Sequence, residues 1–135
     1  MVVVRLIALP RQKYYRPGEI HPCNVLIVDN NGNPVTGQKP TIDITRMSDY
    51  KYLDFSTGKF VSSGGQRYKV LTEIGDGLYG WNFDQDKYEG PNVEETYKIV
   101  YENKGKYQGV TFEEVVYKWP EPIGSEGIFD ESQID

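Results

Sequence analysis

Short runs rich in Val, Ile, Thr, Tyr and Phe alternate along the chain with clusters of Gly, Pro, Asn and Asp, about every 8 to 12 residues. Helical periodicity is nearly absent, so the pattern predicts an all-β protein. Residues 48–66 are expected to form an irregular segment containing one short strand, which gives seven or eight strands in total. The other expected strands are 2–8, 20–28, 41–47, 67–74, 78–84, 95–102 and 107–117.

Alternation within these runs indicates which face of each strand is buried. Ile42 and Ile44 share one face of the strand at 41–47, as in a half-buried strand. The turn at 75–77 predicts a hairpin between 67–74 and 78–84. A second hairpin is expected across 103–106. Three aromatic residues on one face of 78–84 are expected to line the core: Tyr79, Trp81 and Phe83.

The chain has 135 residues, a length typical of one domain. The strand count predicts two antiparallel sheets packed face to face, with a closed barrel as the alternative. We expect a sandwich domain over 1–118 and an extended acidic tail over 119–135. The net charge of −5 belongs to this tail, because residues 1–118 hold 15 acidic and 15 basic side chains. A neutral domain of this kind is not expected to bind nucleic acid.

Other classes are excluded by what the sequence lacks. Residues 1–5 do not begin a signal peptide, and no run of 18 apolar residues could cross a membrane, so we expect no membrane partner. Cys23 is the only cysteine, which excludes an intramolecular disulfide and a Cys-rich zinc site. Stability is therefore expected from core packing, with oligomerisation as a further source, and no cofactor is expected.

His21 and Cys23 place the only imidazole and the only thiol two residues apart, hence on one face of a strand. A Cys/His nucleophile would need this proximity. No nucleophile motif surrounds the pair, Pro22 separates them, and a single cysteine is more often a small buried apolar residue. We therefore expect no catalytic residues and no enzymatic activity. A single histidine excludes a multi-histidine metal site, so oxygen ligands are the expectation for any metal.

Two segments could supply oxygen ligands to a metal ion, and at each of them we prefer an interpretation without a metal. Asp29, Asn31 and Asn33 alternate as at the start of a calcium loop, but Pro34 and Pro40 occupy its Gly and Glu positions. We therefore interpret the segment as a turn. The second group is interpreted as a solvated loop, with a weak cation site as the alternative: Asp84, Asp86, Glu89, Glu94 and Glu95.

Eleven Tyr and two Trp raise the alternative of a carbohydrate-binding or surface-adhesion module, because exposed aromatic rings stack on sugars. Tyr50 and Tyr52, in the aromatic segment 49–68, are the candidate contacts. The preferred interpretation is that many of these rings fill the core or a protein interface.

Four turn-and-strand motifs resemble those of immunoglobulin-like β-sandwich domains, which recur in bacteriophage virion proteins and in bacterial surface proteins. The motifs are at 15–19, 25–35, 72–79 and 95–101, and the resemblance covers about residues 14–118. It implies an immunoglobulin-like antiparallel β-sandwich of about seven to eight strands, and it carries over no catalytic residue.

Because the sandwich begins near Met1 without export signal or repeats, the virion context is preferred. We expect a capsid decoration, neck or tail accessory protein that is made in the host cytoplasm, assembles onto the particle, binds other virion proteins and is multimeric there. The tail is expected to dock through Trp119, Ile128 and Phe129, which would offset its ordering cost. A disordered, solubilising tail is the alternative.

Overall fold

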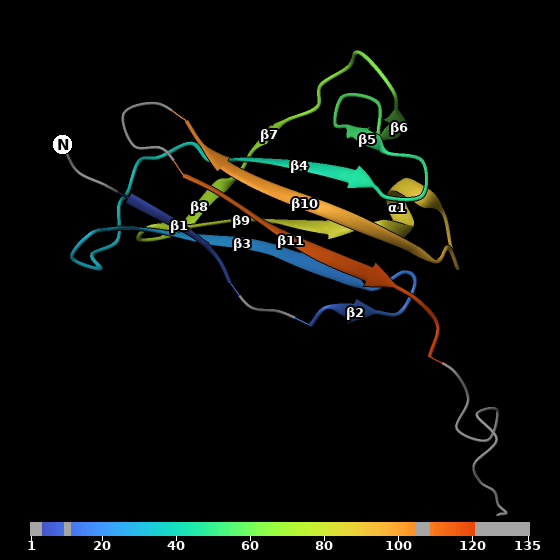
Figure 1. Cartoon of the computed structure of the whole chain (residues 1–135), viewed down its shortest axis with the longest axis horizontal. Coiled ribbons are helices and arrows are strands. Elements are labelled where there is room, and N and C mark those ends of the chain that lie inside the picture. Colours follow the sequence, from blue (N-terminus) through green and yellow to red (C-terminus); the bar gives the residue numbers. More distant parts are fainter. Residues whose placement is uncertain (1–3, 10–11, 105–108, 121–135) are drawn as a thin grey trace, which may run out of the picture.

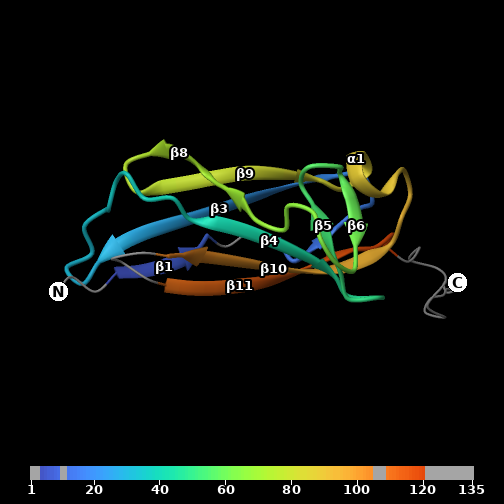
Figure 2. The same cartoon turned by 90° about the horizontal axis from the view of Figure 1, so that it is seen from above.

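The protein consists of two β-sheets packed face to face, as the computed structural model shows for residues 4–9, 12–104 and 109–120 (Figure 1). Seen from above, β3 and β9 lie in one layer and β4, β10 and β11 in the other (Figure 2). The first sheet has the order β1 (Val4–Ala8), β3 (Ile20–Asp29), β9 (Leu78–Asp84), β8 (Thr72–Gly75). The second has the order β2 (Tyr14–Tyr15), β11 (Gly109–Tyr117), β10 (Glu95–Asn103), β4 (Thr41–Arg46), β5 (Lys51–Asp54), β6 (Lys59–Val61), and β7 (Lys69–Val70) also pairs with β4.

This strand order is that of an immunoglobulin-like sandwich. The first sheet corresponds to strands A, B, E and D, and the second to G, F, C, C′ and C″ of the variable type. The chain leaves the first sheet after β1 and joins the second at β2, whose pairing with β11 is parallel, whereas the other strand pairs are antiparallel. The predicted fold class is confirmed. Eight of the eleven strands in the described residues have four residues or more, which matches the expected number.

The segment 48–66 is more regular than predicted. It contains two strands, β5 and β6, which pair with each other and extend the sheet beyond β4. The Asp54 carboxylate closes the turns beside them: it accepts hydrogen bonds from the backbone N–H and hydroxyl of Ser56, the hydroxyl of Thr57 and the N–H of Gln66. The polar residues that suggested an irregular loop therefore stabilise a hairpin.

The first predicted hairpin is confirmed only over β8 and β9, which pair across Gly75 and Leu78. The expected strand 67–74 is divided between the two sheets, since β7 pairs with β4. Leu71 lies between the two pieces, where its side chain enters the core and its N–H donates to the carbonyl of Pro40. The second predicted hairpin, β10 with β11, is confirmed from Glu95 with Tyr117 to Asn103 with Gly109, and residues 105–108 of its expected turn and strand lie outside the described residues.

The connection after β9 contains a helix, α1 (Gln85–Glu89), where a solvated loop was predicted. Five residues are too few to give a periodic signal. The amide of Gln85 is buried and donates to Tyr97, whose hydroxyl donates to Glu89. Tyr97 thus occupies the tyrosine-corner position near the start of strand F, but its partners are side chains of α1.

No helix in the described ranges is long and apolar enough to cross a membrane.

The core between the sheets is unusually rich in tyrosine. Its aliphatic part comes from inward positions on the central strands, among them Val25, Ile27, Ile42, Ile44 and Ile99. Four tyrosines are also fully buried: Tyr79, Tyr97, Tyr101 and Tyr117. Each brings a hydroxyl that loses its bonds to water on burial, so the interior needs polar partners.

Candidate functional site

His21 and Cys23 lie side by side on the inner face of β3, as their spacing predicted. The inward positions of this strand are fully buried from His21 to Ile27, while the intervening side chains are only half-buried. The Sγ of Cys23 donates to the backbone carbonyl of His21 over 3.6 Å. The only imidazole and the only thiol of the chain therefore both face the opposite sheet.

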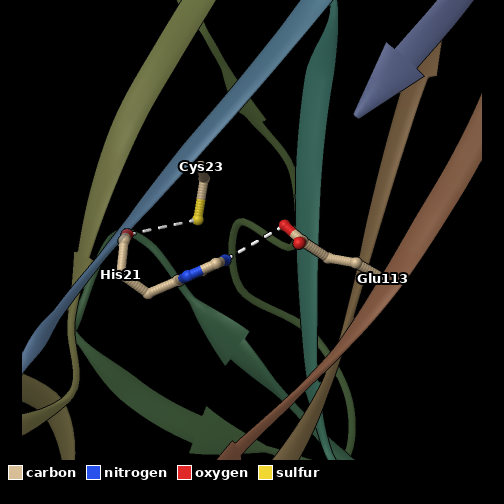
Figure 3. Close-up of side chains that lie close together, drawn as sticks. All are labelled: His21, Cys23 and Glu113. Atoms are coloured by element: carbon tan, nitrogen blue, oxygen red, sulfur yellow. Dashed lines mark hydrogen bonds and ion pairs between the residues drawn. The ribbon is translucent and has the colours of Figure 1, made fainter. Parts of the chain in front are cut away.

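Glu113 reaches this pair from β11, across the space between the sheets (Figure 3). Its Oε1 lies 3.0 Å from Nε2 of His21 and also accepts a hydrogen bond from the hydroxyl of Tyr101. The other ring nitrogen of His21, Nδ1, lies 2.6 Å from the hydroxyl oxygen of Tyr15. We call His21, Cys23 and Glu113 the interior cluster; it links the two sheets through polar contacts.

The electrostatics of the interior cluster disfavour a reactive thiolate. Burial raises the pKa of the Cys23 thiol far above its usual value, with the charge of Glu113 acting in the same direction. Burial likewise raises the pKa of Tyr101, so its hydroxyl stays protonated and donates to Glu113. A protonated, fully buried thiol lacks the depressed pKa of a catalytic cysteine.

The sequence prediction missed Glu113, although the pattern of β11 contains a signal for it. Residues 111, 113, 115 and 117 share the inner face of this strand, and Val115 and Tyr117 are buried in the core. Glu113 is thus an acidic residue on a core-facing position, which requires a partner in the interior. His21 is 92 positions away in sequence and Tyr101 lies on another strand 12 positions away, so strand alternation alone could not name these partners.

Several of the candidate oxygen ligands make contacts within the protein. Oδ1 of Asp29 accepts the backbone N–H groups of Asn31 and Asn33, each at 2.9 Å, as in the predicted turn. In the acidic connection, Glu89 forms an ion pair with Arg46 at 2.8 Å, and Glu95 accepts a hydrogen bond from the hydroxyl of Ser48.

Among the aromatic candidates, Tyr50 is 73% exposed, whereas Tyr52 is half-buried. The hydroxyl of Tyr52 donates to the carbonyl of Gly64, and the Arg67 guanidinium lies 4.5 Å from its ring centroid. Arg67 therefore covers one face of the Tyr52 ring. Sugar binding by this pair stays a prediction.

Apolar side chains gather on the outer face of β11 and β2. Val110, Phe112 and Tyr14 are 65%, 62% and 64% exposed, and Val116 pairs with Tyr14 in register. We call these four residues the outer row.

Trp119 lies just beyond the end of this row. It is 41% exposed and lines a surface cavity of about 640 Å³ together with Tyr14, Tyr15 and Lys118. The remaining predicted contacts, Ile128 and Phe129, lie outside the described residues.

No family model matches this sequence, and no curated protein matches it. Among solved structures, the fold is similar to a conjugative transposon lipoprotein from Bacteroides eggerthii, with a TM-score of 0.43 and 7% sequence identity. The similarity covers 83% of this chain and 95% of that one. The resemblance to bacteriophage domains stays a prediction beside these comparisons.

Proposed function

We propose that the protein is a non-enzymatic interaction protein that binds a partner through the outer row and the adjoining cavity at Trp119. The observation that carries the proposal is the exposure of Val110, Phe112 and Tyr14 on regular strands of one sheet. Exposed apolar side chains gathered on one face of a sheet commonly mark a protein interaction site.

The surroundings of the outer row suit a protein partner. Lys98 lies 5.0 Å from the ring centroid of Phe112, and Lys13 pairs with Glu114 at 3.6 Å. Apolar contacts are therefore flanked by charges of both signs, which is the usual composition of an interface core and its rim. Residues 1–118 are also neutral in total, so net repulsion does not oppose stacking against another protein.

The partner we propose is the repeating surface of a bacteriophage particle, with several copies of the protein bound to it. The turn-and-strand motifs that resemble virion immunoglobulin-like domains support this choice. The acidic segment 121–135 would add a second contact through Ile128 and Phe129. The protonated, buried state of Cys23 supports a role without catalysis.

A matched pair of variants tests this proposal. Phe112→Asp places a charge in the outer row, and Ile74→Asp places one at an equally exposed apolar position of the other sheet. Both are produced as full chains in the host of the particle, checked for folding by circular dichroism, and quantified in particles banded on a density gradient. We expect Phe112→Asp to lower incorporation at least about tenfold, because central aromatic contacts dominate interface energies. Ile74→Asp should behave as wild type.

Two outcomes would contradict the proposal at different levels. Equal incorporation of both variants would show that the outer row is not the contact. Absence of the wild-type protein from the particle band would refute the virion role itself. Deleting residues 121–135 in a parallel experiment tests the second contact separately, since wild-type incorporation of the shortened chain would exclude it.

A further inference from the structure

We propose that the interior cluster of His21, Cys23 and Glu113 is a binding site for a divalent transition metal, Zn²⁺ in the first place. One ligand atom from each residue lies within 4.8 Å of the other two. Two ligands come from β3 in the first sheet and one from β11 in the second. A bound ion would therefore connect the two sheets of a sandwich whose single cysteine cannot form an internal disulfide.

The ligand atoms need only small shifts to reach zinc geometry: the nitrogen and oxygen move slightly apart, and the sulfur moves closer. Zinc bonds of about 2.1 Å to nitrogen or oxygen and about 2.3 Å to sulfur put tetrahedral ligand atoms about 3.3 to 3.6 Å apart. Nε2 of His21 and Oε1 of Glu113 are already 3.0 Å apart. The Cys23 sulfur has to approach by at most about 1.2 Å, the difference between 4.8 Å and the 3.6 Å of a zinc site.

The donor set selects the class of metal. An imidazole nitrogen, a thiolate sulfur and a carboxylate oxygen are the three ligand types of zinc sites, whereas Ca²⁺ and Mg²⁺ take oxygen ligands. A thiol that coordinates zinc loses its proton, so the ligands contribute two negative charges against the two positive charges of the ion. This neutrality matters because His21 and Cys23 are fully buried, and an unbalanced charge there would be costly.

Groups that orient the ligands are already in place. Metal-binding histidines commonly hydrogen-bond a second group through the other ring nitrogen, and Nδ1 of His21 has the Tyr15 hydroxyl at 2.6 Å. The Tyr101 hydroxyl holds the Glu113 carboxylate in the same way.

Tyr117 adds an independent observation. Its hydroxyl is buried and has no hydrogen-bond partner among the described residues. The Tyr117 ring also stacks on the Tyr15 ring, with 5.3 Å between the ring centroids. This free hydroxyl is suited to a water molecule completing the coordination of the metal.

The cluster can also be reached from solvent. Glu113 lines a surface cavity of about 550 Å³ between β1 and β11, next to Leu6, Ala8 and Thr111. The Glu113 side chain is 21% exposed, while that of His21 is not exposed at all. A metal ion would therefore meet the carboxylate first and the two buried ligands afterwards.

Cobalt(II) is the probe for the experiment, because its bond to a thiolate gives a charge-transfer absorption and Zn²⁺ displaces it. The full chain, without an affinity tag and stripped by a chelator, is titrated with Co²⁺ under anaerobic conditions. We expect one cobalt per chain, a thiolate band, and loss of the band on adding Zn²⁺. Cys23→Ser should abolish the band, since no other thiol is present.

Variants of β11 and β2 provide matched controls. Glu113→Gln should lower cobalt affinity at least about tenfold, while Glu114→Gln, on the outward face of the same strand, should not change it. Tyr15→Phe should lower affinity by about 10 to 100-fold through the loss of the bond to His21, and the exposed neighbour Tyr14→Phe should not. Urea unfolding of each variant establishes whether it is folded. If Cys23→Ser does not fold, the comparison of Tyr15→Phe with Tyr14→Phe still tests the site.

Three results would overturn the site. The first is the absence of a thiolate band in the wild-type protein up to about 1 mM Co²⁺. The second is wild-type cobalt affinity in Glu113→Gln, which would exclude the carboxylate as a ligand. The third is one cobalt per two chains, which would place the metal between copies of the protein.

Discussion

The hydroxyl of Tyr97 gives a direct measure of how much the buried polar bonds stabilise this sandwich. It donates to Oε2 of Glu89 at 2.7 Å and accepts from Nε2 of Gln85 at 3.1 Å. Burial raises the pKa of Tyr97 far above its usual value, so the donor is present over the whole working range of pH. The substitution Tyr97→Phe removes this hydroxyl and keeps the ring that packs on Phe83.

The expected loss follows from the partners that remain. A hydrogen bond to a charged group contributes about 1.5 to 3 kcal/mol. Glu89 keeps its ion pair with Arg46, and Gln85 keeps its bond to the carbonyl of Val93, so neither is left without a partner. We therefore expect Tyr97→Phe to lower the free energy of unfolding by about 2 kcal/mol.

Urea unfolding followed by tryptophan fluorescence measures this change. With a denaturant slope of about 2 kcal/mol/M, the midpoint should fall by about 1 M at an unchanged slope. Tyr50→Phe is the control, because this exposed residue should change stability by less than about 0.5 kcal/mol. A midpoint shift below about 0.25 M in Tyr97→Phe would refute the assigned role of the hydroxyl.

Two further predictions concern the turns. Gly77→Ala should destabilise by at least about 1 kcal/mol more than Gly32→Ala in the same assay. Both glycines have positive φ, but a Cβ at Gly77 would lie 2.7 Å from that of Pro34, whereas Gly32 has open space; equal effects would contradict this. Hydrogen bonds, first from the Ser56 hydroxyl, hold the pKa of Asp54 below its ordinary value of 3.8. The ionised Asp54 carboxylate therefore stabilises the folded state above about pH 4, and this contribution is lost as pH falls through the folded-state pKa. Asp54→Asn should therefore flatten the dependence of the urea midpoint on acid pH, and an unchanged slope would exclude Asp54 as its source.

The sequence predicted the inward side of each main strand well, because strand alternation is a local property. Ile42 and Ile44, expected on one face, are both fully buried. His21 and Cys23 likewise share the inner face of β3. Alternation does not report how deeply Asp43, between them, is buried: the segment carrying Arg67 covers it, and Arg67 pairs with it at 3.0 Å.

The sequence by itself determined an all-β chain with its two main hairpins, because turn residues and period-two alternation act between neighbours along the chain. Tertiary structure decided what lies across the core. It brought Glu113 to His21 and Cys23, closed the tyrosine corner at Tyr97 with α1, and left Phe112 exposed on the outer row. Each of these depends on which strands become neighbours in space, and strand order is set by the summed packing of both sheets.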